Sequence, residues 1–423
     1  MKDLITVLDI GTTKISVIIA RFNKEKFEIL LSNKYPSSGL KKGKIVDMEA
    51  ITTSIKKALK DTFETSGIKI KKGFLCISGT DINGTYSKGT TRVKKKIVTH
   101  EDVDLSVESA TAVNLPSDRE IMHILPVEFI LDGVEGIKDP AGMKGIRLDV
   151  KVYIVTASLP QIENFVTCCE KAGIEIEEVI LQSVASSEAV LTNHEKETGV
   201  LVADIGGGTT DIAVFYDGYL RHIATYGIGG NHITNDLVIG LKIPFAEAEK
   251  IKWQYGIALP DINFGSLRFK GNNNDVEVIG LDRKPIKVHS SVINEIVYAR
   301  CEEILGFLNK EIESLPDDIS VNSAVITGGC SLTQGFITLA EGLLSMPVRM
   351  GKPKTGIVQM LSDAGMEEDI SEQDDSIAEF YNPEFSSSLG SLIYAIKGSF
   401  FKEEKHLDDG ILGRLKALIK EWL

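Results

Sequence analysis

The hydrophobic residues of this 423-residue chain follow one short pattern twice. "VLDIGTTKISVIIA" runs from Val7 to Ala20, and "VADIGGGTTDIAVF" runs from Val202 to Phe215. In each stretch a β-branched run ends in an aspartate, a Gly/Thr turn follows, and a second β-rich run begins, which is typical of a β-hairpin. The repeat predicts one such hairpin in each half of the chain, with Asp9 or Asp204 at its tip.

Other segments show the patterns of a buried strand or of a helix. "SAVITGGCSLTQGF", residues 323–336, predicts a strand, a turn at Gly328 and Gly329, and a helix start at Ser331 to Gln334. Helices are predicted at residues 99–114 with Thr99 as N-cap, 181–190, 246–256 and 294–305. Residues 362–384 are acidic with no Lys or Arg, which predicts a solvated loop before a last helix.

The chain ends in "GILGRLKALIKEWL", residues 410–423. On a helix its large apolar residues form one continuous stripe. They are Ile411, Leu412, Leu415, Leu418, Ile419, Trp422 and Leu423, and the cations opposite are Arg414, Lys416 and Lys420. Thirteen helical residues span about 20 Å, short of the roughly 30 Å hydrocarbon core. Because polar residues 400–410 separate the stripe from the folded body, we expect it to lie on a membrane surface; packing on the domain is the alternative.

Charge and cysteine usage narrow the class of protein. A formal net charge of -13 argues against a nucleic-acid-binding protein, which needs a basic face. The five cysteines form no C-x-x-C pair, so neither a disulfide framework nor a zinc site is predicted. The start lacks a signal-peptide pattern, and no apolar run approaches the roughly 20 residues of a transmembrane helix. We therefore expect a protein of the reducing cytoplasm.

The two turns carry residues suited to phosphate and magnesium. Glycines let consecutive backbone N–H groups turn toward an anion, and hydroxyls and a lysine add donors. The candidates are Gly11, Thr12, Thr13 and Lys14 in the first turn and Gly206, Gly207, Gly208, Thr209 and Thr210 in the second. Asp9 and Asp204 are suited to hold Mg²⁺ through waters, because this ion keeps most of its hydration shell. The alternative is a pair of ordinary tight hairpins.

The two hairpins and the 323–336 segment, in this order, resemble the motifs of the actin, Hsp70 and sugar-kinase superfamily. The resemblance implies an α/β, actin-like fold of two lobes around an ATP cleft, with Gly328 and Gly329 at the adenosine. It places Gln182 and Asp211 at the attacking water, although Gln182 also fits a plain position beside a helix N-cap. It places Glu249 and Lys252 at the ribose and adenine, where a surface ion pair is the alternative.

Residues between the motifs indicate one branch of that superfamily. The block from Leu75 to Ala157, and above all "GIKDPAGMKGIRL" at residues 136–148, resembles the FtsA family of bacterial cell-division proteins. This resemblance implies an ATP- and Mg²⁺-binding protein that polymerises with itself on an anionic lipid membrane, at the cytoplasmic face of the division septum. It implies that the protein binds the C-terminal peptide of FtsZ, with Arg300 as candidate contact and solvated surface as the alternative. Later division proteins would bind the inserted subdomain, and ATP turnover is left open.

The resemblance also divides the chain. Lobe 1 comprises residues 1–80 and 158–197, with the inserted subdomain at 81–157 and the acidic loop and last helix at 353–400. Lobe 2 comprises 198–228 and 298–352, with a small subdomain at 229–297. A linker at 401–410 precedes the membrane-targeting helix at 411–423. Alternatives are a membrane-free assembly ATPase of the pilus type and a small-molecule kinase of the same fold, neither of which has a use for the terminal stripe.

Overall fold

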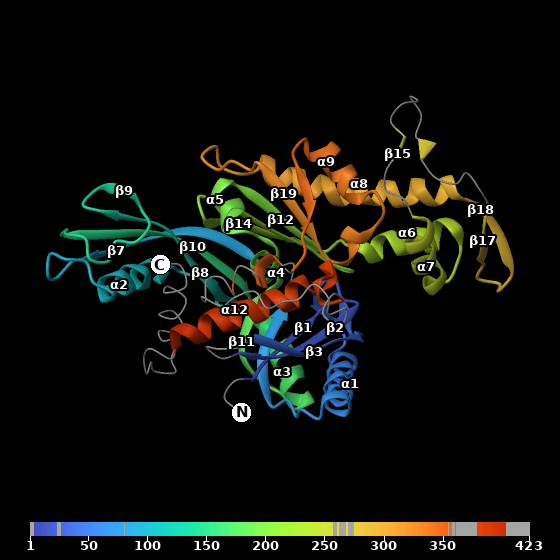
Figure 1. Cartoon of the computed structure of the whole chain (residues 1–423), viewed down its shortest axis with the longest axis horizontal. Helices are drawn as coiled ribbons and strands as arrows, with labels where there is room; N and C mark the ends of the chain where they lie inside the picture. The colour runs from blue at the N-terminus through green and yellow to red at the C-terminus, as the bar shows by residue number, and fades with distance from the viewer. Residues whose placement is uncertain are drawn as a thin grey trace.

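The computed structural model describes residues 4–22, 27–79, 81–256, 260–261, 268–269, 275–353, 355–357, 360 and 379–402. These residues form an elongated body with two five-stranded sheets in its middle (Figure 1). A third, four-stranded sheet lies at one end, and a helical part with small two-stranded sheets lies at the other. The acidic segment 361–378 and the predicted terminal helix lie outside the described residues.

The two central sheets have the same topology, as the internal repeat predicts. The first has the order β11-β6-β1-β2-β3, and the second, in reverse, has β20-β19-β12-β13-β14. Each hairpin is antiparallel, and its first strand also pairs in parallel with a later strand. The strands of the first sheet are β1 (Leu4–Ile10), β2 (Lys14–Phe22), β3 (Phe27–Pro36), β6 (Lys72–Ile77) and β11 (Glu175–Leu181). Those of the second are β12 (Val200–Ile205), β13 (Thr210–Tyr216), β14 (Tyr219–Tyr226), β19 (Ser323–Thr327) and β20 (Val348–Met350). Both predicted hairpins are thus confirmed.

The inserted block forms a small subdomain with its own core. Its sheet has the order β7-β10-β8-β9 and packs against α2. The elements are β7 (Asn83–Arg92), α2 (His100–Thr111), β8 (Arg119–Leu131), β9 (Val134–Ile137) and β10 (Arg147–Ser158). Thr99 caps α2 in a reciprocal capping box with Asp102, as predicted, and the helix ends three residues before the expected Asn114. Val103, Val107 and Phe129 are buried in this core.

The remaining elements cover the sheets and build the other end of the body. Around the first sheet lie β4 (Leu40–Lys41), β5 (Lys44–Ile45), α1 (Met48–Ser66) and α3 (Leu159–Ala172), whereas α5 (Asn193–Thr198) packs on β13 of the second sheet. Beside the second lie α6 (Gly230–Leu241), α7 (Phe245–Tyr255), α8 (Ser290–Glu313) and α9 (Phe336–Leu344), with β15 (Pro260–Asp261), β16 (Arg268–Phe269), β17 (Asp275–Ile279) and β18 (Pro285–His289). The helix start predicted at Ser331 to Gln334 is wrong. A 3-10 turn occupies Gly329–Leu332, and α9 begins only after Gly335, whose positive φ of 78° interrupts the helix.

Two helices cross in the middle of the molecule. They are α4 (Gln182–Val190) and α12 (Ser386–Lys402), which runs across the middle of the body in Figure 1. A Cβ on Gly390 would lie 1.7 Å from the carbonyl oxygen of Ala185, so only glycine permits this approach of the two backbones. The predicted last helix is therefore confirmed. The predicted loop before it is wrong at its end, because residues 379–381 and 383–385 form 3-10 turns.

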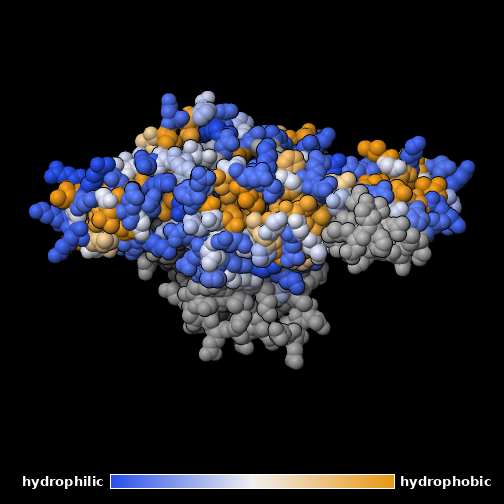
Figure 2. All heavy atoms as spheres, turned by 90° about the horizontal axis from the view of Figure 1, so that it is seen from above, coloured by the Kyte–Doolittle hydropathy of each residue, from blue (hydrophilic) through white to orange (hydrophobic). Residues whose placement is uncertain are grey.

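The exposed surface carries apolar side chains in several separate places. Ile239, Leu281, Val46 and Val134 are among the most exposed, and they belong to different elements. On the face drawn in Figure 2, apolar residues are interspersed with hydrophilic ones along the body. Among the helices formed by the described residues, none is both long and apolar enough to cross a membrane.

A buried ion triad fastens α12 to the rest of the first lobe. The Glu188 carboxylate on α4 lies 2.5 Å from Nζ of Lys196 on α5 and 2.7 Å from Nζ of Lys397 on α12. Its side chain is only 9% exposed, yet the two lysines hold the pKa of the carboxyl well below its usual value against the effect of burial. Removing the carboxylate would leave two partly buried cations without their counterion.

We predict that Glu188→Gln lowers the free energy of unfolding by about 3 kcal/mol at pH 7. The folded pKa of Glu188 is depressed, so its stabilisation is fully present above the unfolded value near 4.5 and is lost as the pH falls through the folded value. Urea unfolding at pH 7 and pH 3 measures this, and the difference between variant and parent should shrink at pH 3. The matched control is Glu197→Gln, an exposed change on α5, the helix that carries Lys196. An equal effect of both substitutions would contradict the triad.

Candidate functional site

The turns of the two hairpins abut across the space between the lobes. A Cβ on Gly207 would lie 2.4 Å from Cγ2 of Thr13, and one on Gly208 would lie 2.4 Å from Oγ1 of Thr12. Larger residues at 207 and 208 would push the hairpins apart, which explains why the second turn needs glycine. The structure therefore brings together the two turns that the sequence marks as phosphate motifs.

A cavity of about 270 Å³ opens beside these turns. It is lined by Thr13, Lys14, Lys34, Gly206, Gly207, Gly230, Asn231, Glu249, Lys252, Trp253, Gly329, Cys330, Thr333 and Glu384. Seven of these were candidates from the sequence. The other candidates, Gly11, Thr12, Gly208, Thr209, Thr210 and Gly328, belong to the same turns but do not line this cavity. Sequence analysis missed seven lining residues, and they come from β3, α6, α7, the 3-10 turn at Gly329–Leu332 with Thr333 after it, and the 3-10 turn before α12.

Three buried carboxylates lie behind the turns. Asp204 and Asp211 are direct cross-strand partners in the second hairpin, and Asp9 is at the end of β1 in the first. Burial, together with the charge of Asp204, raises the pKa of Asp211 to about 7. Burial and the charge of Asp9 raise the pKa of Asp204 to about 6, and burial raises that of Asp9. Like charges held this close in a dry space favour protonation unless a cation is present.

Hydrogen bonds from the crossing helices orient two of these carboxylates. Gln182 Nε2 on α4 donates to Asp9 Oδ1 at 2.6 Å, and Ser387 Oγ on α12 donates to Asp9 Oδ2 at 2.6 Å. Ser186 Oγ on α4 donates to Asp204 Oδ2. The structure places the sequence candidate Gln182 beside Asp9, at the first position of α4, so both of its interpretations are still open.

The carboxylates suit a hydrated magnesium ion better than a fully protein-ligated metal. Within the described ranges, no group of three or more His, Cys, Asp and Glu side chains lies in an arrangement that could hold a metal ion. Mg²⁺ keeps several waters and usually takes one or two carboxylates plus phosphate oxygens. Asp9 and Asp204, whose pKa values are raised by burial and lowered in part by the charge of Lys14, fit that mode of binding.

Two lysines bring positive charge to the cavity wall. Lys14 Nζ donates to the backbone carbonyl of Glu384, and Lys34 Nζ lies 2.7 Å from a Glu384 carboxylate oxygen. Both ammonium groups lie over the ring of Phe385, at 5.5 and 5.3 Å from its centre. Burial lowers the pKa of Lys14 against the opposing effect of nearby carboxylates. An anion in the cavity would therefore meet at least one cation that is already fixed in place.

The Glu249 and Lys252 pair lines the same cavity. Lys252 Nζ is 2.7 Å from Glu249 Oε1, and the Lys252 side chain is only 5% exposed. Thr234 and Trp253 also donate to the Glu249 carboxylate, the latter from Nε1 at 2.8 Å. The pair is thus part of a fixed polar network at the cavity rather than a free surface ion pair.

Arg300 lies outside the cavity, on α8. Its guanidinium makes two hydrogen bonds to Asp236 on α6, at 2.6 and 3.0 Å, and a further one to Glu303. An acidic partner would therefore meet an arginine that is already held by carboxylates of its own chain.

Comparison with known proteins places this geometry in a family. The family model described as "Cell division protein FtsA" matches residues 201–390, and the model of the "SHS2 domain inserted in FTSA" matches residues 79–156. The "Cell division protein FtsA" of Neisseria meningitidis is 35% identical over 428 residues, which cover 98% of each chain. The chain belongs to the FtsA family of cell division proteins. FtsA of Bacillus subtilis is 36% identical over 83% of this chain and 79% of its own, and FtsA of Escherichia coli K12 is 29% identical over 100% and 98%.

Solved structures confirm the actin-like fold of this FtsA-family chain. The PilM-PilN complex of type IV pilus biogenesis has a TM-score of 0.62 at 15% identity, covering 92% of this chain and 98% of its own. MreB 5 of Spiroplasma citri bound to AMPPNP has a TM-score of 0.52 at 14% identity, covering 95% and 98%. A family model of the pilus assembly protein PilM also matches residues 136–261.

We predict that the pH dependence of stability of this FtsA-family protein changes in Asp211→Asn. The pKa of Asp211 is raised in the fold, so its neutral form is favoured there, and this contribution is lost as the pH rises from about 4 to about 7. Without nucleotide, the free energy of unfolding of the parent should fall by about 2 kcal/mol more than that of the variant between pH 5 and pH 8. Urea unfolding at both pH values measures the difference. The control is Asp217→Asn, an exposed change in the turn between β13 and β14, which should behave as the parent. Parallel pH profiles of stability for Asp211→Asn and the parent would refute the prediction.

Proposed function

We propose that this protein is an actin-like, ATP-binding division protein that polymerises on the inner face of the cytoplasmic membrane. There it anchors FtsZ and helps to recruit later division proteins. The observation that carries the proposal is the contact of two glycine-containing hairpins beside a cavity with fixed lysines and buried carboxylates, in a chain of the FtsA family. A fold neighbour, MreB 5, has been solved with AMPPNP and with ADP, which supports a nucleotide as the ligand.

The residues of the site have distinct proposed roles. Backbone amides of both turns and Lys14 bind the phosphates, while Asp9 and Asp204 hold the hydrated Mg²⁺. When bound, the ion neutralises phosphate charge. Glu249 and Lys252 contact the ribose and adenine, and Gly328 and Gly329 allow the adenosine to approach the backbone. Gln182 and Asp211 orient the attacking water. Because hydrolysis depends on positioning and charge neutralisation, this set supports slow turnover.

The membrane attachment is argued from the sequence of residues 411–423. Each cation near an anionic leaflet contributes about 1 kcal/mol, and a tryptophan suits the headgroup region. A single short helix gives weak, reversible attachment. Polymerisation would array many such helices along one surface, so that avidity makes the attachment firm.

Partner binding is proposed for two surfaces far apart in the body. The small subdomain of the second lobe would bind the acidic FtsZ tail peptide, with Arg300 released from Asp236 or shared with it. The inserted subdomain at the other end would contact later division proteins and neighbouring copies (Figure 1). The pilus-type assembly protein is the second candidate, because a PilM model matches residues 136–261 and the PilM-PilN complex shares the fold.

We predict that Lys14→Ala weakens Mg²⁺·ATP binding at least tenfold, or about 1.4 kcal/mol, because it removes a charge-assisted contact to phosphate. Isothermal titration calorimetry of the full chain measures the affinity. Lys57→Ala, an exposed change on α1, is the control and should leave the affinity unchanged. Binding by the parent that is insensitive to Lys14→Ala would remove Lys14 from the site, and no binding by the parent would refute the nucleotide function.

We predict that the full chain co-sediments with anionic liposomes and that Mg²⁺·ATP increases the bound fraction. Leu418→Glu places a charge within the apolar stripe and should reduce the bound fraction at least fivefold, whereas Ala417→Glu falls on the opposite face of the predicted helix and should have little effect. A chain truncated after Phe401 should stay in the supernatant. Equal sedimentation of both point variants, or of the truncated chain, would instead favour the membrane-free candidate.

A further inference from the structure

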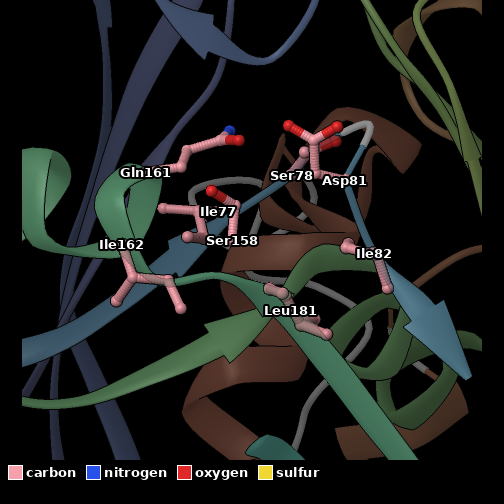
Figure 3. A pocket seen from close by; sticks show the side chains of 10 residues that line it. Ile77, Ser78, Asp81, Ile82, Ser158, Gln161, Ile162 and Leu181 are labelled. Carbon is pink, nitrogen blue, oxygen red and sulfur yellow. The ribbon is translucent and has the colours of Figure 1, made fainter. Parts of the chain in front are cut away.

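The inserted subdomain is connected to the first lobe at a place that touches the candidate site. Its chain leaves β6 at Ile77 and reaches β7 at Asn83, and it returns through Ser158, the N-cap of α3. A small pocket between these two connections is lined by Ser78, Asp81, Ser158 and Gln161, among others, and Figure 3 shows Gln161 extending from α3 toward the segment that carries Ser78. We call residues 78–79, 81–82 and 157–159 the root of the subdomain.

Ser78, the first residue after β6, makes a hydrogen bond from one lobe to the other. Its Oγ lies 2.8 Å from both Oδ1 and Oδ2 of Asp211 on β13. Both side chains are buried. Thr209 and Thr225 also bond this carboxylate, and Thr225, whose Oγ1 lies at 2.9 Å, comes from β14 in the same sheet as Asp211. The bond from Ser78 thus differs from that of Thr225, because it crosses between the two sheets.

The root also packs against both hairpins through the turn at Lys42 and Gly43. Gly43 N donates to Oγ1 of Thr12, and a Cβ on Gly43 would lie 3.0 Å from Cγ2 of Thr209. From the other side, Gln161 Nε2 donates to the Gly43 carbonyl at 2.9 Å. One turn therefore contacts the first hairpin, the second hairpin and the helix that begins at the root.

Arg119 holds the two connections of the root together. Its guanidinium on β8 donates to the carbonyls of Asp81 and Thr156, each at 2.8 Å, and to Thr156 Oγ1 at 2.9 Å. A displacement of residues 78–79 and 81–82 would therefore act directly on β8 and β10, because hydrogen bonds to a charged donor are strong and directional.

The subdomain has a second support on the other lobe. Tyr86 OH on β7 donates to the Arg221 carbonyl at 2.8 Å, and Ile223 N donates to Tyr153 OH on β10 at 3.2 Å. Arg221 and Ile223 both belong to β14, which also carries Thr225. The subdomain is thus covalently attached to the first lobe and hydrogen-bonded to the second.

We propose that Ser78 is a positioning residue that couples Asp211 at the candidate nucleotide site to the orientation of the inserted subdomain. Any change in the separation of the lobes alters the Ser78–Asp211 bond at the root and the Tyr86 and Tyr153 contacts along β14 together. Nucleotide binding between the lobes then changes the surface that the subdomain offers to its partners. This coupling rests on the proposed nucleotide function, and it adds a residue that none of the sequence motifs contains.

The experiment is amide hydrogen exchange of the full chain, with and without saturating Mg²⁺·AMPPNP, whose affinity is measured separately by calorimetry. In the parent, AMPPNP should slow exchange in β7, β8 and β10 at least threefold. In Ser78→Ala, AMPPNP should still bind within about threefold of the parent affinity, and the slowing in these strands should fall below 1.5-fold. Ser78→Thr, which keeps the hydroxyl, should restore at least half of the response.

Thr225→Ala is the matched control, because it removes a hydrogen bond from the same carboxylate without cutting the link between the sheets. It should keep the response of β7, β8 and β10. A Ser78→Ala chain that binds AMPPNP and keeps the full response overturns the coupling alone, as does a parent that binds AMPPNP without any response in the subdomain. A parent that does not bind AMPPNP overturns the proposed nucleotide function and the coupling with it.

Discussion

The close crossing of α4 and α12 is the contact on which the site depends. Gly390 lets the two backbones meet at Ala185, and this brings the first turns of both helices to the buried aspartates. Gln182 and Ser387 then bond the two oxygens of Asp9 from different helices. Helix α4 packs against both central sheets and α12 packs against the first, so the carboxylate positions are set by tertiary packing rather than by the hairpins alone.

Electrostatics sets the second constraint. Burial raises the pKa of Asp9, Asp204 and Asp211, while it lowers the pKa of Lys14. The fold thus holds several groups in an environment that favours their neutral forms, and this opposes stability at neutral pH. A ligand that brings both phosphate and a divalent cation would stabilise the charged forms of these groups. The cation compensates the negative charge of the carboxylates, and the phosphate compensates the positive charge of the lysine. The same groups that reduce the stability of the empty cleft therefore favour binding.

The sequence predicts what is local and fails where distant segments meet. The repeated hairpins, the N-cap at Thr99 and the glycine turns follow from short patterns, and the structure shows all of them. Lys34 and Glu384 enter the same cavity from segments 350 residues apart, so no spacing rule could link them. The role of Ser78 could not be predicted either, because a single serine after a strand forms no motif, and its partner Asp211 lies in the other lobe. The helix start at Ser331 was wrong since Gly335 outweighs the local pattern.

The direction of α12 links the two ends of the proposed mechanism. Its first turn contacts Asp9, and its last residues lead toward the predicted linker, so its 17 residues cover about 25 Å between the nucleotide site and the start of the tail. Glu188 binds this helix near its far end through Lys397, while Gly390 fixes its middle. Together with the Ser387–Asp9 bond, these contacts hold the helix at three places against α4 and the first sheet. The far end of α12 therefore belongs to the part of the fold that contacts α4 and the first sheet, and the Ser78–Asp211 bond is a link through which a motion of the second sheet would reach the root.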